Sequence, residues 1–258
     1  ALGATVVLAC RDAQKGEAAR ADLAASTGND RVTMIPLDLA DLRGSDRSIR
    51  GFVSRLRERF DRLDVLVNNA GVNTVRRQVT RDGFEMTFGV NHLGTFALTL
   101  ALRDLLERSA PSRVAVVSSR LHRRGKLVWD DLQRERRRFS GLGAYNDSKL
   151  ANVLFANALA ERLAGTGVTV NSLHPGLVRT ELVRDLPAPV RMLFHLLGRA
   201  ISPVEGAACS LHVASAPELA GVTGRYFEKS RPVDPAPAAL DREAQARLWE
   251  LSEKWTAN

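Results

Sequence analysis

Short apolar runs alternate with longer stretches of helical periodicity along this chain, and this alternation limits the folds it can adopt. Residues 5–9 are apolar without polar alternation, which is typical of a strand buried on both faces. Similar runs occupy residues 32–35, 63–67, 113–118 and 168–173, and helical stretches lie at residues 13–26, 45–60, 83–108 and 145–164. Strand and helix repeated in this order predict an α/β fold with a parallel, doubly wound sheet.

The ends of these elements carry signals of their own. Asp12 and Ser45 are expected N-caps, because their side chains can accept from the free N–H groups of a first helical turn. The glycines at positions 165 and 167 are expected to end the helix before them. A chain of 258 residues fits one large domain, and no linker separates a second one. We therefore expect a single domain over residues 1–258.

Composition narrows the class of protein. Hydrophobic residues make up 45% of the chain and charged residues 26%, which is typical of a globular protein. No apolar run approaches the roughly 20 residues that cross a bilayer, and no leader pattern opens the chain. Cys10 and Cys209 lie far apart without metal-ligand spacing, which disfavours a zinc site or a disulfide framework. We expect a soluble, cytoplasmic protein without a metal.

The formal charge of +8 raises the question of nucleic-acid binding, because clustered arginines can neutralise phosphates. The alternative is a solvated surface, since Asp130, Asp131 and Glu135 are interspersed and no aromatic stacking platform accompanies the cluster. This second interpretation is favoured, so no nucleic-acid partner is expected. The basic residues concerned are Arg120, Arg123, Arg124, Lys126, Arg134, Arg136, Arg137 and Arg138.

Polar residues follow directly on each predicted strand. In open parallel sheets the ligand lies beyond the carboxyl ends of the strands, so this position selects candidate site residues. The position that these groups share indicates a ligand site more strongly than any single group does. The groups are Cys10-Arg11-Asp12, Asp38-Leu39, Asn68-Asn69-Ala70-Gly71, Ser118-Ser119 and His174-Pro175-Gly176.

Tyr145 and Lys149 are the strongest candidates for catalysis. They are spaced i, i+4, so a helix that begins near Tyr145 places both side chains on one face. A free tyrosine has a pKa near 10, and a nearby ammonium is expected to lower that pKa by favouring the phenolate. Such a tyrosine can exchange a proton with an alcohol oxygen. The alternative is a helix-capping tyrosine beside an exposed lysine.

Two further polar residues can support this chemistry. Ser119 ends the strand over residues 113–118, where its hydroxyl can stabilise charge on a substrate oxygen, while Ser118 points to the opposite side. Asn91 lies inside a helical stretch, where asparagine is unfavourable, so a specific hydrogen bond is expected. His92, His122 and His174 are interpreted as structural histidines. There is no Gly-x-Ser-x-Gly elbow of a serine hydrolase.

Together these motifs resemble the short-chain dehydrogenase/reductase family, over most of the chain. The order and spacing of Asn68-Asn69-Ala70-Gly71, Asn91, Ser119, Tyr145-x-x-x-Lys149 and Pro175-Gly176 carry the resemblance. Within the family the chain is most similar to the retinol-dehydrogenase-like branch. Residues 8–12, 148–152 and 202–206, and the long interval between Ser119 and Tyr145, carry that similarity. The resemblance implies a Rossmann-type sheet with helices on both faces, in three α/β/α layers.

The resemblance also implies roles for the catalytic residues. Tyr145 would be the general acid/base, and Lys149 would also bind the nicotinamide ribose. Ser119 would orient the substrate oxygen, and Asn91 would hold a water that links Lys149 to solvent. Hydride would pass directly between the nicotinamide and the substrate carbon, while the protein supplies position and a proton. The chain would therefore be an enzyme that interconverts an alcohol and a carbonyl.

The cofactor residues are assigned in the same way. Asp38 would contact the adenine, residues 68–71 would line the cofactor cleft, and Val178 with Thr180 would meet the carboxamide. The full expected set is Arg11, Asp38, Leu39, Asn69, Ala70, Gly71, Tyr145, Lys149, Pro175, Gly176, Val178 and Thr180.

The residues after the first run indicate which dinucleotide binds. NAD sites place a carboxylate against the ribose 2′-OH, whereas an arginine accommodates the 2′-phosphate of NADP. In this chain Cys10 and Arg11 follow the run over residues 5–9. Cys10 stands where the carboxylate would be, and Arg11 can pair with a phosphate. NADP(H) is therefore the expected cofactor, with NAD(H) as the second option.

The family's first strand and its glycine-rich turn have no counterpart in this sequence. Residues 1–4 look like the end of the helix that follows that turn. We interpret the chain as N-terminally truncated by a few tens of residues. Loss of a central strand is expected to leave two ladder edges unpaired and to remove the backbone donors for the pyrophosphate. Because these donors are missing, we expect residues 1–258 alone to bind the cofactor weakly.

Residues 182–201 are where this family places its substrate lid. The stretch is rich in large apolar residues with Arg191 and Arg199 interspersed, which fits a helix over an apolar substrate, a membrane-surface contact or a helix that completes the core. A homodimer is one option for the oligomeric state. The competing functional hypothesis is a non-catalytic dinucleotide-sensing or interaction protein on the same fold, or an inactive truncated fragment.

Overall fold

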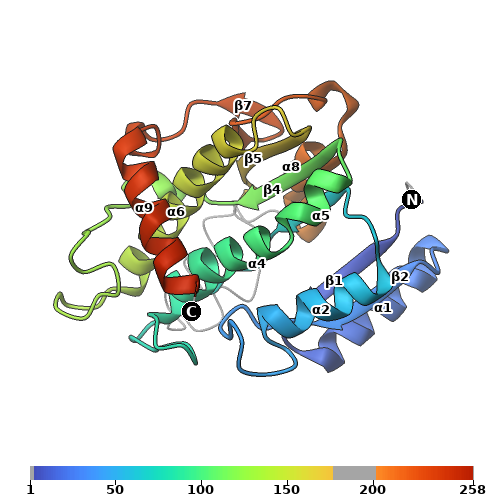
Figure 1. Ribbon diagram of the computed structural model, residues 1–258, viewed down its shortest axis with the longest axis horizontal. Coiled ribbons are helices and arrows are strands. Elements are labelled where there is room, and N and C mark those ends of the chain that lie inside the picture. The colour runs from blue at the N-terminus through green and yellow to red at the C-terminus, as the bar shows by residue number, and fades with distance from the viewer. Residues whose placement is uncertain (1–2, 177–201, 258) are drawn as a thin grey trace.

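A computed structural model describes residues 3–176 and 202–257 of the chain (Figure 1). The strands are β1 (Val6–Cys10), β2 (Val32–Pro36), β3 (Val65–Asn68), β4 (Ser112–Val117), β5 (Val168–His174), β6 (Tyr226–Glu228) and β7 (Arg231–Val233). The α-helices are α1 (Ala13–Thr27), α2 (Ile49–Arg59), α3 (Met86–Phe88), α4 (Thr95–Ala101), α5 (Arg103–Arg108), α6 (Gly141–Arg162), α8 (Pro203–Ser215) and α9 (Arg242–Thr256). Shorter turns are the π-helix η1 (Gly89–Gly94) and the 3₁₀ helices η2 (Arg120–Arg124), η4 (Pro217–Leu219) and η5 (Pro237–Ala239).

The predicted α/β class is confirmed. Strands β3, β4, β5 and β6 form a parallel sheet in that order, and β7 adds an antiparallel edge. Strand β4 shows why helices cover both faces, because its side chains alternate. Val114 and Val116 pack into a core with α6, whereas Ala115 and Val117 pack against Cys209 and its neighbours on α8. Three layers result over this part of the sheet.

Strands β1 and β2 form a separate parallel pair, as Figure 1 shows at its lower right. Within residues 3–176 and 202–257, β1 is hydrogen-bonded only to β2, and β3 only to β4. The edge of β3 is accordingly open, with Val65 37% and Val67 40% exposed. The expectation of two unpaired ladder edges is confirmed, and such edges are where further strands add.

Helices α1 and α2 cover opposite faces of the β1–β2 pair. A Cβ at Gly16 of α1 would lie 2.9 Å from Met34 Cγ, so glycine lets this helix pack closely. Phe52 of α2 instead joins the core that contains Ile35. Because Met34 and Ile35 are consecutive residues of β2, they face opposite sides. The doubly wound arrangement therefore holds here too.

The helix caps follow the sequence in one case and depart from it in another. Asp12 caps α1 as expected, accepting from the Lys15 N–H at 3.0 Å. Ser45 was the wrong residue for α2, because Ser48 is its N-cap and accepts from Gly51 N–H. The physical reason lies in Asp41, whose carboxylate accepts from the Gly44 N–H at 2.6 Å. Asp41 thus stabilises a turn before Ser45, and helix α2 begins only after Ser48.

The single helix predicted over residues 83–108 is also wrong. The stretch divides into α3, the π-helix η1, α4 and α5. Glycines at positions 89 and 94 bound the wide turn of η1, and a Cβ at Gly94 would lie 2.5 Å from the Leu39 carbonyl oxygen. The helix has to pass this close to the end of β2, which favours glycine there. A π-turn of this kind frequently marks a functional site, and Asn91 lies within it.

Within residues 3–176 and 202–257, none of the helices combines the length and the apolar character that a membrane span requires. The proposed lid over residues 182–201 lies outside the described part of the chain.

Candidate active site

Tyr145 and Lys149 lie in the first half of α6. The helix begins at Gly141, earlier than predicted, because Ser140 caps it by accepting from the Gly143 N–H at 3.2 Å. The side chains share a face as expected, with Lys149 Nζ 5.5 Å from the Tyr145 ring centroid. Lys149 is only 2% exposed and donates to the Val117 carbonyl oxygen at 3.0 Å. The last residue of β4 therefore anchors the ammonium.

Burial dominates the electrostatics of this pair. Desolvation lowers the pKa of Lys149 to about 8. It also raises the pKa of Tyr145 to about 12, and a hydrogen bond with Ser119 opposes that rise only in part. The expected lowering of the tyrosine pKa is thus wrong for this state of the protein. The ammonium donates to a backbone carbonyl beside the ring, so desolvation of the phenol outweighs its attraction.

Ser119 follows β4 and is 8% exposed. Its hydroxyl oxygen accepts from the Leu121 N–H and caps η2, which fixes the side chain beside Tyr145. Ser118 donates to the Lys149 carbonyl oxygen at 2.7 Å. The two consecutive serines thus have separate roles, one at the site and one that holds α6 against the strand.

The buried side chain of His122 forms a hydrogen bond with the backbone of Ser119. Nε2 of His122 accepts from the Ala236 N–H at 2.9 Å, so the proton is on Nδ1, which donates to the Ser119 carbonyl oxygen at 2.7 Å. Burial lowers the pKa of His122, which keeps it neutral. His92 is likewise fully buried, with Nε2 2.8 Å from Ser252 Oγ. The interpretation as a satisfied structural histidine is confirmed for His122, whereas Nδ1 of His92 is buried without a hydrogen-bond partner among the described residues.

His174 differs from His122 in its hydrogen bonding. It is the last residue of β5, and burial lowers its pKa to about 4. Its Nδ1 is buried without a hydrogen-bond partner among the described residues. His174 is therefore not the structural histidine with all its hydrogen bonds made that the sequence analysis expected.

Asn91 has the specific hydrogen bonds that its helical position suggested. Its side-chain oxygen accepts from the Val72 N–H at 2.7 Å, and its Nδ2 donates to the Val72 carbonyl oxygen at 3.0 Å. Nδ2 also donates to Ser148 Oγ at 3.0 Å, and Ser148 in turn donates to the Tyr145 carbonyl oxygen at 2.8 Å. Asn91 therefore joins the loop after β3 to the helix that bears the tyrosine.

Gly71 completes the group around Lys149. A Cβ at this position would lie 3.4 Å from Lys149 Nζ and 3.5 Å from Asn91 Oδ1. A Cβ would therefore be in van der Waals contact with the ammonium, and glycine leaves that space open. Asn69 and Ala70 precede it and are exposed at the end of β3. Gly71 therefore lies next to Lys149, with Asn69 and Ala70 between it and β3.

The remaining cofactor candidates lie at the ends of other strands. Arg11 is exposed after β1, and Asp38 follows β2, where its carboxylate accepts from the Ala40 N–H at 3.0 Å. Leu39 lies against η1 through its carbonyl oxygen, near Gly94. Pro175 and Gly176 follow β5, and Gly176 has a φ of +99°, which favours glycine. Val178 and Thr180 lie outside the described residues.

The site thus divides into two parts. Residues Gly71, Asn91, Ser119, Tyr145 and Lys149 come together around the first half of α6. Arg11 and Asp38 lie on the separate β1–β2 pair, whose ends are tied by the Leu37 N–H donating to the Cys10 carbonyl oxygen at 3.0 Å. Within the described residues no group of acidic, histidine or cysteine side chains could hold a metal ion.

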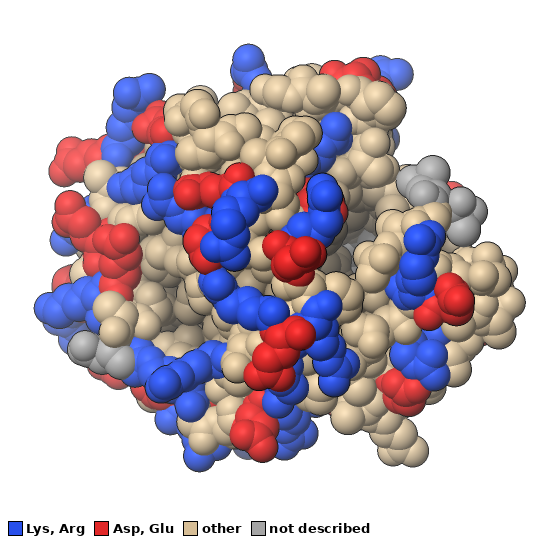
Figure 2. All heavy atoms as spheres, turned by 45° about the vertical axis from the view of Figure 1, so that its right-hand side comes forward, with Lys and Arg blue, Asp and Glu red and all other residues tan. Residues whose placement is uncertain are grey.

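Four residues of the basic cluster, Arg120, Arg134, Arg136 and Arg137, form ion pairs with acidic side chains. Arg120 pairs with Glu228 at 2.6 Å, and Arg136 with Asp130 at 3.2 Å. Figure 2 shows Lys and Arg interleaved with Asp and Glu over the displayed face. The interpretation as a solvated face fails for Arg134, which is 7% exposed and pairs with Asp147 at 2.7 Å. Sequence reasoning missed this buried pair because its two residues belong to different local patterns.

The comparisons with known proteins agree with this geometry. The profile of the short chain dehydrogenase family matches residues 1–190. Human retinol dehydrogenase 14 is 45% identical over 98% of this chain and 79% of its own length. Human retinol dehydrogenase 13 is 45% identical over 98% of this chain and 77% of its own length.

Solved structures give the same result. The crystal structure of an uncharacterised protein from Mycobacterium paratuberculosis is similar with a TM-score of 0.73 and 33% identity, covering 99% of this chain and 85% of that protein. The Pseudomonas aeruginosa RhlG/NADP active-site complex is similar with a TM-score of 0.67 and 27% identity, covering 87% of this chain and 84% of that one. The fold and site define an oxidoreductase of the Rossmann type. The chain belongs to the short-chain dehydrogenase family, and it is similar to its retinol dehydrogenases.

The buried Lys149 predicts a specific pH dependence of stability. Its pKa is about 8 in the folded chain against an ordinary 10.5, so the unfolded state binds more protons between these values and stability rises with pH. Relative to a Lys149→Met variant, wild type is expected to gain about 2 kcal/mol between pH 7 and pH 10. Urea unfolding of both proteins at the two pH values measures this change. An unchanged difference would show that the ammonium is not desolvated.

Proposed function

We propose that this protein is an NADP(H)-dependent oxidoreductase that interconverts an alcohol and a carbonyl on an apolar substrate. The observation that carries the proposal is the convergence of the Tyr145 phenol, the Ser119 hydroxyl and the buried Lys149 ammonium at one end of β4. Asn91 fixes the loop after β3 beside them. This arrangement provides a proton, an orienting hydroxyl and a positive charge at one place.

The roles of Tyr145 and Ser119 fit the properties of these groups, and those of Lys149 and Asn91 are the ones that the family resemblance implies. With a pKa of about 12, Tyr145 holds its proton at neutral pH and can donate it to the oxygen of a carbonyl under reduction. Ser119 orients that oxygen by a hydrogen bond. Lys149 would hold the nicotinamide ribose, and Asn91 would hold a water that links Lys149 to solvent. When bound, the dinucleotide would supply or accept the hydride of the substrate carbon.

The preference for NADP(H) rests on the end of β1. The last residue of the strand is Cys10, where a carboxylate for the ribose 2′-OH would stand, and Arg11 is exposed next to it. Asp12 follows, but its carboxylate caps α1 by accepting from the Lys15 N–H. The Asp12 carboxylate is thus engaged at the N-terminus of α1. The similarity to the RhlG/NADP complex supports the same choice.

An apolar substrate fits the exposed surface beside the catalytic helix. Leu142 in the first turn of α6 is 53% exposed, and Val75 in the loop after β3 is 54% exposed. The two segments are in close contact, because a Cβ at Gly141 would lie 2.2 Å from the Thr74 carbonyl oxygen. Exposed apolar side chains near a reacting group favour an apolar ligand. The names of the retinol dehydrogenases to which the chain is similar support this substrate class.

Replacing Tyr145 with Phe tests the proton transfer. The variant keeps the ring but lacks the transferable proton, so kcat for carbonyl reduction is expected to fall by about 100-fold or more, while NADPH binding changes little. Steady-state assays with NADPH and apolar aldehydes measure the first, and fluorescence titration the second. Tyr226→Phe is the matched control, because its hydroxyl donates to Glu228 instead. Equal losses in both variants would contradict the assignment.

Replacing Arg11 with Gln tests the cofactor preference. Loss of the guanidinium is expected to raise the KM for NADPH about tenfold and to leave the KM for NADH within about twofold, because only NADPH carries the 2′-phosphate. Both constants are measured with the same carbonyl substrate. Wild type should prefer NADPH, and a clear preference for NADH would sink the proposal.

A further inference from the structure

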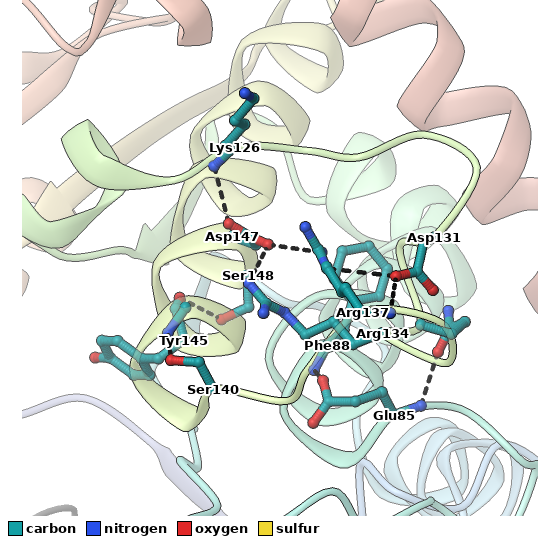
Figure 3. Close-up of polar contacts among 12 residues, drawn as sticks. Glu85, Phe88, Lys126, Asp131, Arg134, Arg137, Ser140, Tyr145, Asp147 and Ser148 are labelled. Atoms are coloured by element: carbon teal, nitrogen blue, oxygen red, sulfur yellow. Dashed lines mark hydrogen bonds and ion pairs between the residues drawn. The ribbon is translucent and has the colours of Figure 1, made fainter.

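A buried carboxylate lies on α6 between the two catalytic residues. The Asp147 side chain is 8% exposed and accepts hydrogen bonds from three directions (Figure 3). The Lys126 N–H donates to its Oδ1 at 2.8 Å, while Arg134 Nη2 and Arg137 Nη2 donate to its Oδ2 at 2.7 Å and 3.1 Å. Asp147 thus holds the chain between η2 and α6, residues 125–140, against the catalytic helix at several points.

Arg134 lies against the first turn of that helix. A Cβ at Gly143 would be 2.7 Å from Arg134 Nη2, so the guanidinium packs directly on the backbone two residues before Tyr145. Arg134 also has a φ of +50°, a left-handed conformation that non-glycine residues rarely adopt. Such a conformation persists only where surrounding contacts enforce it, and it concentrates near functional sites. The ion pair with Asp147 supplies that contact.

The segment held by Asp147 is itself rigidly organised. Asp131 Oδ1 accepts from the Glu135 N–H at 2.7 Å, and Asp131 Oδ2 accepts from the Arg137 N–H at 3.2 Å. Asp131 also lies 3.5 Å from Arg137 Nε as an ion pair. The charges of Asp131 and Asp147 therefore balance those of Arg134 and Arg137. Loss of one carboxylate would leave a buried positive charge without its partner.

The same segment reaches the helix that carries Asn91. Gln133 Oε1 accepts from the Glu85 N–H at 2.7 Å. The fully buried Glu85 carboxylate accepts from the N–H groups of Thr87 at 2.9 Å and Phe88 at 2.8 Å, and so caps α3. Helix α3 continues directly into η1, where Asn91 lies.

A closed ring of contacts results around the catalytic helix. From Asn91 the ring returns to α6 through Ser148, whose hydroxyl donates to the Tyr145 carbonyl oxygen. From Asp147 it leaves α6 again through Arg134 and reaches α3 through Gln133. The ring contacts α6 at Asp147 and at Ser148, both within one turn of Tyr145. The direction of that turn is therefore set by contacts from two sides.

We propose that Asp147 is a positioning residue for catalysis, which holds the first turn of α6, and with it the Tyr145 phenol, in the productive orientation. The inference rests on the proposed role of Tyr145 as general acid/base. A residue that only stabilises the fold would affect unfolding without changing the chemical step. A positioning residue lowers kcat even where the protein is folded and binds cofactor, because displacement of a catalytic group by about 1 Å can cost 100-fold in rate.

The test compares Asp147→Asn with wild type in an active preparation. Asparagine keeps the size and can still accept from Lys126, but it cannot balance the two arginines. We expect kcat with NADPH and an apolar aldehyde to fall about tenfold or more, with the Kd for NADPH within about twofold. Asp130→Asn is the matched control, since Asp130 is exposed and pairs only with Arg136 in the described structure. It should retain the wild-type kcat.

A second readout does not depend on turnover. Amide hydrogen exchange over residues 141–147 should be faster in Asp147→Asn than in wild type, and unchanged in Asp130→Asn, because only the former loosens the first turn of α6. Where Asp147→Asn does not fold, Arg134→Lys replaces it. Lysine keeps the charge but not the planar group under Gly143, so a lower kcat with an unchanged Kd is again expected.

The outcomes separate the two claims. If wild type reduces no carbonyl, the proposed function fails, and hydrogen exchange alone decides whether Asp147 holds the first turn. If wild type is active and the folded variant keeps kcat within about twofold, the positioning role is overturned. It is equally overturned if kcat and the Kd for NADPH worsen together, or if exchange over residues 141–147 does not change.

Discussion

The side chain of Asn91 is the contact on which the catalytic arrangement depends. Its amide oxygen and nitrogen bind the backbone N–H and carbonyl of Val72, in the manner of a strand partner, and its nitrogen also reaches Ser148. One fully buried side chain thus joins the loop after β3, the π-helix η1 and the helix α6. The wide turn of η1 presents Asn91 to all of them, and glycines on either side let that turn pass close to its neighbours.

The second constraint is the burial of Lys149. An ammonium enclosed by protein is unfavourable unless a strong acceptor meets it, and the carbonyl of Val117 does so at 3.0 Å. The same enclosure raises the pKa of Tyr145 to about 12. In this state the phenol is a proton donor. It can become a base only when further positive charge comes close to its oxygen, because an opposite charge favours the phenolate.

Much of the fold could be predicted from the sequence, because buried parallel strands are nearly continuous apolar runs. The strands at residues 5–9, 32–35, 63–67, 113–118 and 168–173 were placed within about two residues, and the polar groups after them lie at the carboxyl ends of the strands, as expected. The open edges of β1 and β3 followed from the family pattern. These features depend on local periodicity and on the order of motifs, which a single sequence displays directly.

Other features depend on contacts between distant segments, and the sequence did not reveal them. The π-turn over residues 89–94 interrupts a stretch whose apolar spacing reads as one helix. Arg134 is read as solvated within a run of arginines, although Asp147 holds it in the interior. The pKa of Tyr145 was expected to fall because the spacing shows the nearby lysine but not the burial. Local sequence patterns do not show how deeply a side chain is buried.

The ionisation of Tyr145 is a direct measure of its role as the acid/base. The chain has two tyrosines, so replacing Tyr226 with Phe leaves Tyr145 as the one phenol to observe. Tyrosine labelled with ¹³C at Cζ then reports its titration by NMR, with and without NADP⁺. We expect no ionisation below about pH 11 in the free protein, and a pKa at least about two units lower with NADP⁺, whose nicotinamide is positively charged. An identical pKa in both states would contradict the assignment of Tyr145 as the acid/base.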